Sequence, residues 1–406
     1  MNNKPRIRFK GFTEDWEQRK LGNLTQLITK GTTPKVKNIQ NGINFIKVEN
    51  ISDDGVISIN SYVSEEEHMN YLSRSILANN DILFSIAGTL GRTAIVKSHL
   101  LPANTNQALA IIRLNKSVDV EYINTFLKSN AIKTYIRKNP TVGAQPNLSL
   151  GQVSDLEINI PNYSEQKKIS NLFSKFDLMI TLHQRKLEKL KLAKKALLQK
   201  LFPKNGSQFP EIRFKGFTDA WEQRKLGDLA EIVRGASPRP ISDPKWFDTD
   251  SSVGWLRIAD VTAQDGRIRY LEQKISELGQ EKTRVIKTPH LLLSIAATVG
   301  KPVINYVPTG VHDGFLIFLN PKFNILYTFW WLEMFREKWN KYGQPGSQVN
   351  LNSDLVKNQV INIPNKKEQE KISSFLESLD KVITLHQCKL DKLQEVKKGL
   401  LQKMFV

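Results

Sequence analysis

The stretch RIRFKGFTEDWEQRKLGNL at residues 6–24 occurs a second time as EIRFKGFTDAWEQRKLGDL at residues 211–229. Counted from Pro5 and Pro210, 16 of 20 positions are identical. Another stretch, INIPNYSEQKKIS at 158–170, returns as INIPNKKEQEKIS at 361–373. Repeats of this length and similarity indicate a duplicated structural unit. The chain is therefore expected to contain one framework twice.

Two intervals between the repeats, 30–157 and 234–360, have only a faint similarity, but it keeps its order. GTTP at 31–34 corresponds to GASP at 235–238, and ILFSIAGTLGR at 82–92 corresponds to LLLSIAATVGK at 291–301. The alternative to two specialised intervals is a gene duplication with no division of function. The pattern predicts four segments: a first domain at 1–157, a first conserved segment at 158–203, a second domain at 204–360 and a second conserved segment at 361–406.

Both conserved segments are predicted to form a long helix, over 165–202 and 368–405. Asn162 and Glu165, like Asn365 and Glu368, have the spacing of a helix-capping pair. Apolar positions then step alternately by four and three, a period of 3.5 residues that is typical of coiled coils. Each seam needs an apolar partner, and the other helix is the nearest candidate. The predicted seam residues are Ile180, His183, Leu187, Leu190, Lys194, Leu197, Ile383, His386, Leu390, Leu393, Lys397 and Leu400.

Histidine and lysine interrupt the two seams at matching places, His183 with His386 and Lys194 with Lys397. Polar residues inside a seam commonly specify register and pairing. We therefore expect these side chains to fix how the helices pair, and not to bind a metal or catalyse a reaction.

The two intervals are predicted to be mixed α/β domains. Short apolar runs of strand type lie at 44–48, 82–86, 93–97 and 108–114, and again at 254–258, 291–295, 302–306 and 315–319. A helix is expected after each set, at about 119–138 and 324–342. Its bulky residues in the second interval, Trp330 and Trp331, are expected in the core.

Composition limits the class of protein. The 406 residues, 40% hydrophobic and 24% charged, suit two or three globular domains. A single cysteine, Cys388, excludes an internal disulfide framework and favours a reducing cytosol, and the first residues lack the apolar stretch of a secretory signal. A cytoplasmic protein without a membrane span is expected.

The net charge of +19 suggests a polyanionic partner. The excess is uneven, because residues 165–202 carry ten Lys and Arg against three Asp and Glu. Interval 30–157 carries 13 basic against 11 acidic residues. The intervals are thus only weakly basic, which argues against a simple basic DNA-binding domain.

Motifs of known catalytic chemistry are missing from the sequence. It has no phosphate-binding Gly-x-x-x-x-Gly-Lys-Ser/Thr loop and no dinucleotide-binding Gly-x-Gly-x-x-Gly turn. Asp260 or Asp265 followed by Glu272 and Lys274 resembles a nuclease pattern, but surface salt bridges are the preferred interpretation. We expect no catalytic residues and no metal ligands. The alternatives are a self-contained nuclease or methyltransferase, and a coiled-coil scaffold that does not touch DNA.

The repeated RFKGFT…WEQRKLG and INIPN…EQ-x-KI stretches, with SIAGTLGR and VGAQPNLS, resemble the specificity subunit of type I restriction–modification systems over essentially the whole chain. The resemblance implies two target recognition domains, each recognising one half of a bipartite DNA sequence. It implies that the helices form an antiparallel coiled coil that spaces these domains and docks two modification subunits. Those subunits would bind S-adenosylmethionine and methylate adenine. Restriction subunits would use ATP and Mg²⁺, leaving this chain without a cofactor.

Within that interpretation, polar or basic residues in glycine-marked loops are the candidates for DNA contact. Arg and Lys suit guanine, and Asn and Gln suit adenine. A loop Lys that is simply solvated, and an Asn or Gln that satisfies backbone groups, are the alternatives for each. In the first domain the candidates are Lys30, Thr32, Thr33, Lys35, Lys37, Arg92, Asn104, Asn106, Gln107, Gln145 and Asn147. In the second they are Arg234, Ser237, Arg239, Lys245, Arg257, Lys301, His312, Asp313, Gln348 and Asn350.

Overall fold

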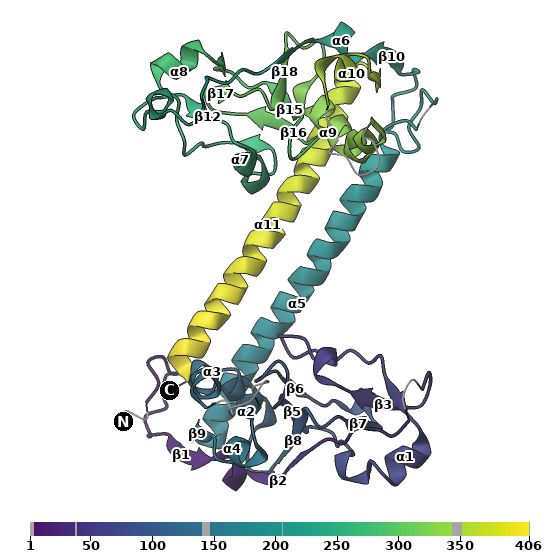
Figure 1. The fold of residues 1–406 in the computed structure, drawn as a ribbon. Coiled ribbons are helices and arrows are strands. Elements are labelled where there is room, and N and C mark those ends of the chain that lie inside the picture. Colours follow the sequence, from purple (N-terminus) through teal and green to yellow (C-terminus); the bar gives the residue numbers. More distant parts are fainter. Residues whose placement is uncertain (1–3, 37–38, 140–146, 205, 343–350, 406) are drawn as a thin grey trace. The chain divides into compact units, whose positions relative to one another are not determined.

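The computed structural model describes residues 4–36, 39–139, 147–204, 206–342 and 351–405. The chain divides into two compact units, Met1–Arg185 with His386–Val406 (unit 1) and Lys186–Leu385 (unit 2). Each unit combines strands, short helices and parts of both long helices (Figure 1). The mixed α/β fold class predicted from the sequence is confirmed.

In the described part of unit 1, the strands form three small sheets. Strand β1 (Glu17–Lys20) pairs antiparallel with β9 (Glu157–Ile160). A four-stranded antiparallel sheet has the order β2 (Thr25–Lys30), β8 (Leu109–Leu114), β5 (Ile82–Ser85), β6 (Thr93–Ile95). A three-stranded sheet has the order β4 (Tyr62–Val63), β3 (Ile43–Ile46), β7 (Ala103–Thr105). The short helices are η1 (Leu21–Leu24), η2 (Val48–Asn50), α1 (Glu65–Met69), η3 (Ser73–Ser75), η4 (Ser98–Leu100), α2 (Val120–Leu127), α3 (Asn130–Lys138) and α4 (Leu150–Ser154).

Unit 2 repeats this plan with an additional edge strand. Strand β10 (Glu222–Lys225) pairs antiparallel with β19 (Val360–Ile363). The larger sheet has the order β11 (Glu231–Arg234), β18 (Phe315–Leu319), β15 (Leu291–Ser294), β16 (Pro302–Asn305), β13 (Arg267–Ile268). The smaller sheet has the order β12 (Gly254–Trp255), β17 (Thr309–Val311), β14 (Arg284–Ile286). The short helices are α6 (Leu226–Leu229), η5 (Pro244–Trp246), α7 (Ile258–Ala263), α8 (Glu277–Glu281), α9 (Ile325–Phe335), η6 (Arg336–Tyr342) and α10 (Ser353–Lys357).

The long helices are α5 (Tyr163–Lys200) and α11 (Lys366–Met404). Both agree with the predicted helices to within two residues at each end. Asn162 Oδ1 accepts the Glu165 N–H at 3.0 Å, and Asn365 Oδ1 accepts the Glu368 N–H at 3.0 Å, so the predicted caps are formed. Among the described helices, none has the length together with the apolar character that crossing a bilayer requires.

Within unit 1, α5 and α11 run antiparallel. Asp177 pairs with Lys397, and further along α5 the Nδ1 of His183 lies 3.0 Å from the Nδ1 of His386. Within unit 2, Lys194 of α5 pairs with Asp380 of α11. The side chains of Ile180, Leu187 and Leu390 are buried along the predicted seam, and its other members are half-buried. Aspartates on the facing helix therefore neutralise both seam lysines.

The repeated sequences form matching contacts in both units. Tyr122 packs edge-on against Trp16 and donates its hydroxyl to the Asn159 carbonyl at 2.6 Å. Tyr327 packs in the same way against Trp221 and donates to the Asn362 carbonyl at 2.9 Å. Met404 at the end of α11 and the next residue, Phe405, enter the first of these cores. Leu198 at the end of α5 enters the second, together with Leu201 and Phe202, which follow the helix.

The prediction of one helix at 119–138 is wrong. Two helices, α2 and α3, replace it, because the chain turns at Lys128 and Ser129, where the Ser129 N–H donates to the Phe126 carbonyl at 2.8 Å. In unit 2, the helix expected at 324–342 is α9 followed by the 3₁₀ turn η6. Trp330 and Trp331 are buried there, as expected.

Candidate nucleic-acid interface

In unit 1, the loop after β2 lies against the turn after β7. The Gly31 N–H donates to the Leu109 carbonyl at 3.1 Å, and the Thr32 N–H donates to the Thr105 carbonyl at 3.0 Å. A Cβ on Gly31 would lie 2.1 Å from the Asn106 carbonyl oxygen, so this approach requires glycine. The two segments are also joined by side chains, since the Thr33 hydroxyl donates to Gln107 Oε1.

Unit 2 builds the same loop pair with different side chains. The Gly235 N–H donates to the Phe315 carbonyl at 2.9 Å and the Ala236 N–H donates to the Val311 carbonyl at 3.0 Å. A Cβ on Gly235 would lie 2.1 Å from the carbonyl oxygen of His312. Here the Ser237 hydroxyl donates to Asp313 Oδ1 at 2.8 Å.

Basic side chains gather around Asp313. Arg239 donates from Nη2 to Asp313 Oδ2 at 2.8 Å, and Arg234 donates from Nε to the Asp313 carbonyl at 2.6 Å. Arg284 was not a candidate, yet its Nε donates to the Arg234 carbonyl at 2.8 Å. No local pattern around Arg284 in the sequence indicated this contact, because Arg234 lies 50 positions away.

A third loop, at SIAGTLGR in unit 1 and SIAATVGK in unit 2, ends on a basic residue that differs in exposure. Arg92 is 27% exposed and pairs with Asp53 at 2.9 Å. Lys301 is 10% exposed and contacts Asp265 at 2.6 Å and Glu333 at 3.3 Å. The same motif position is therefore half-buried in one unit and buried in the other.

Comparison with known proteins identifies the family of the chain that carries these paired loops. A family model, described as the type I restriction modification DNA specificity domain, matches the chain twice, at residues 13–192 and 218–395. The chain belongs to this family. Its role is DNA sequence recognition as the non-catalytic specificity subunit of a type I restriction–modification system, which confirms the resemblance seen in the sequence.

Relatives match over nearly the whole specificity subunit. The putative type I restriction enzyme MjaX specificity subunit of Methanocaldococcus jannaschii is 26% identical over 405 residues, covering 96% of this chain and 92% of that protein. The type I restriction enzyme MjaVIII specificity subunit of the same organism is 24% identical, covering 96% and 91%. The solved S subunit of the type I system of M. genitalium has a TM-score of 0.65 at 14% identity and covers 99% of both chains. That last likeness shows the fold alone.

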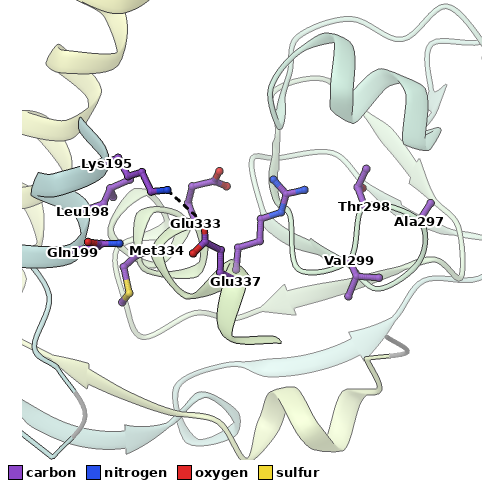
Figure 2. Close-up of a pocket in the computed structure, with 10 residues that line it drawn as sticks. Lys195, Leu198, Gln199, Ala297, Thr298, Val299, Glu333, Met334 and Glu337 are labelled. Atoms are coloured by element: carbon purple, nitrogen blue, oxygen red, sulfur yellow. Dashed lines mark ion pairs between the residues drawn. The ribbon is translucent and has the colours of Figure 1, made fainter. Parts of the chain in front are cut away.

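One cavity of unit 2 has charged walls (Figure 2). Lys195 of α5 and Glu337 form an ion pair across it at 3.9 Å, and the loop 297–299 closes another side. The described ranges contain no group of three or more His, Cys, Asp or Glu that could hold a metal. Outside this cavity, Asp260 and Glu272 both form salt bridges with Arg257, at 2.9 and 3.5 Å. Salt bridges are the interpretation that the sequence favours over a nuclease pattern.

The candidate DNA contacts that the structure describes are buried, half-buried or exposed, and the remaining candidates lie outside the described residues. Two are buried: Lys301, and Asn104, whose amide nitrogen donates to the Leu72 carbonyl at 2.9 Å and whose Oδ1 accepts from His68 Nδ1 at 2.6 Å. Four lie outside the described residues: Lys37, Gln145, Gln348 and Asn350. Half-buried are Thr32, Arg92, Asn106, Ser237, Arg257, His312 and Asp313. Exposed are Lys30, Thr33, Lys35, Gln107, Asn147, Arg234, Arg239 and Lys245.

The structure gathers only part of this set. Thr32, Thr33, Asn106 and Gln107 meet in the loop pair of unit 1, and Arg234, Ser237, Arg239 and Asp313 meet in that of unit 2. Lys245 instead pairs with Asp243 at 2.8 Å and lies over the Trp246 ring. His312 packs against the rings of Trp255 and Phe315, and burial lowers its pKa, so it is a neutral packing residue at neutral pH.

Proposed function

We propose that the two intervals recognise different halves of a bipartite, asymmetric DNA sequence, as target recognition domains at 1–157 and 204–360. The conserved segments 158–203 and 361–406 would be the spacer helices that determine the unread gap between the halves. The observation that carries this proposal is the contrast between identical frameworks and different loops. The Trp–Tyr contacts recur in both units, whereas Thr33 and Gln107 are replaced by Ser237 and Asp313.

The exposed members of the two loop pairs are the proposed base contacts. Arg and Lys can donate to guanine, and Gln can pair with adenine in the major groove. Because each interval is only weakly basic, we propose that partner subunits supply most phosphate contacts. The isolated chain would then bind DNA weakly and lose that binding steeply with added salt.

The long helices have exposed apolar residues that suit partner docking. Met179 and Leu182 of α5 are 41% and 54% exposed in unit 1, and Val382 and Leu385 of α11 are 41% and 54% exposed in unit 2. These pairs occupy matching positions in the repeat. We propose that each receives an apolar helix of one modification subunit, which gives two modification subunits per chain. The methyl donor, ATP and Mg²⁺ would be bound by partner subunits.

The test is a map of methylated adenines in cells that express the complete system. The native chain should yield one split sequence of two unlike halves. A chain whose residues 30–157 come from another family member should change one half and leave the other half and the gap unchanged. A change in both halves, or methylation that does not depend on the chain, would contradict the proposal.

A further inference from the structure

The loop pairs of the two units share one side-chain contact, which we call the loop clasp. It is the Thr33–Gln107 contact in unit 1 and the Ser237–Asp313 contact in unit 2. Backbone hydrogen bonds establish that these residues correspond, because Gly31 and Gly235 donate to matching carbonyls, those of Leu109 and Phe315. The clasp thus lies in the same framework in both units, but it is neutral in one and charged in the other.

Resting on the function proposed above, we propose that the clasp determines base specificity and that Arg239 of unit 2 recognises a guanine. Asp313 is then a positioning residue, which orients the Arg239 guanidinium without touching the base. The corresponding contact in unit 1 has no carboxylate, so unit 1 recognises a different base at this place.

The contacts of Asp313 hold its carboxylate from two sides. Oδ1 accepts from the Ser237 hydroxyl at 2.8 Å, and Oδ2 accepts from Arg239 Nη2 at 2.8 Å. Arg234 also binds the Asp313 backbone carbonyl at 2.6 Å, which ties strand β11 to the same turn. Both oxygens of the Asp313 carboxylate are therefore engaged within the loop pair, and Oδ2 is the atom that Arg239 contacts.

Arg239 keeps most of its donors for a ligand. Its side chain is 79% exposed, and Nη2 is its one nitrogen with a hydrogen-bond partner among the described residues. A guanidinium has five N–H groups in a planar fork, and two of them match the O6 and N7 acceptors of guanine. Pro238 and Pro240 flank Arg239 and restrict the backbone of its loop. We expect this exposed ion pair to add little to the stability of the fold.

The ionisation of Asp313 agrees with this role. Burial by itself would raise the pKa of Asp313, but the Ser237 hydrogen bond and the charges of the neighbouring arginines, Arg239 and Arg234, act against it, and the pKa is lowered. The carboxylate is therefore charged at neutral pH, and the contact is lost only in acid, as the pH falls through the lowered value.

Unit 1 places different groups at the same positions. Lys35 corresponds to Arg239, and its ammonium lies 4.3 Å from the centre of the Tyr71 ring. A lysine cannot form a planar bidentate contact. Gln107 accepts from Thr33 through Oε1, which leaves its amide N–H groups to donate. The two clasps therefore offer different hydrogen-bonding patterns to DNA.

The experiment compares methylated-adenine maps from the complete system with Arg239→Lys, Arg239→Ala, Asp313→Asn and the control Arg269→Ala. Arg269 is an exposed arginine of the same unit that stacks on Tyr306. Replacing residues 30–157 first identifies which half belongs to unit 2. We expect a fixed G·C pair in that half, and each Arg239 variant should lower discrimination there about 10-fold or more. Asp313→Asn should relax the same base pair alone, whereas Arg269→Ala should leave the sequence unchanged.

Each other outcome overturns the inference. A unit 2 half without a fixed G·C pair excludes guanine recognition by Arg239. Weaker methylation at all sites with unchanged sequence would make Arg239 a phosphate contact. Relaxation by Arg239→Ala but not by Asp313→Asn, with both variants equally folded by thermal denaturation, would remove the positioning role. If the native chain instead yields no split sequence, the proposed function itself fails.

Discussion

At the scale of single residues, two buried carboxylates, those of Glu165 and Glu368, stabilise the beginning of the long helices. Both are fully buried, and each accepts two hydrogen bonds from one arginine. Arg8 binds Glu165 at 2.7 and 2.8 Å, and Arg213 binds Glu368 at the same two distances. The hydrogen bonds to these carboxylates raise the pKa of Arg8 and of Arg213. Both arginines belong to the repeated RFKGFT stretch, so the same contact forms in each unit.

Replacing Arg213 by alanine should lower the free energy of unfolding by about 3–5 kcal/mol, because it leaves a buried charge without a partner. Urea denaturation of the full chain measures this loss. The control is Arg224→Ala, which removes an exposed arginine 3.7 Å from Glu222 and should cost within about 0.5 kcal/mol. Equal losses in the free energy of unfolding for the two variants would show that the buried Arg213–Glu368 pair contributes no more than an exposed pair.

At the scale of elements, each long helix has one face that pairs with the other long helix and another face with exposed apolar residues. The seam residues are buried or half-buried, and Lys194 and Lys397 each meet an aspartate of the facing helix. The outward positions Leu182 and Leu385 are each 54% exposed although they are leucines. Pairing of α5 with α11 therefore does not account for these outward leucines, and this is why we propose that modification subunits dock on them.

Changing Leu182 and Leu385 together to glutamate should abolish co-purification of the modification subunit, because a charge would have to enter an apolar contact. Each single change should leave one modification subunit bound, measured by the mass of the purified complex. The control is Leu192→Glu, since Leu192 is 70% exposed and the second copy has Glu395 at the matching position. Retention of both modification subunits by the double variant would refute the docking proposal.

At the scale of the whole molecule, both units contain parts of both long helices. Helix length is therefore the parameter that we expect to control the gap in the recognised DNA sequence. Seven inserted residues add about 10.5 Å of helix and keep the seam in register. At 3.4 Å per base pair, that length corresponds to at most about three base pairs.

Inserting one heptad between His183 and Leu187, and one between His386 and Leu390, should lengthen the gap while both half-sites stay unchanged. The methylated-adenine map reports half-sites and gap together. Insertion into α5 alone is the control, and it should disrupt pairing because the seams no longer match. Altered half-sites with an unchanged gap in the double insertion would contradict the separation of spacing from base recognition.

The sequence by itself determined the duplication, the long helices and the faces on which they pair. This is because helical periodicity is a local pattern and the framework sequences occur twice in the chain. The bounds of α5 and α11 could be predicted to within two residues for that reason. Only the tertiary structure decided where α2 ends, that Lys301 is buried while Arg92 is not, and that Ser237 meets Asp313, 76 positions away. Such contacts depend on how distant strands pair and which groups they bury, and no local pattern of residues carries that information.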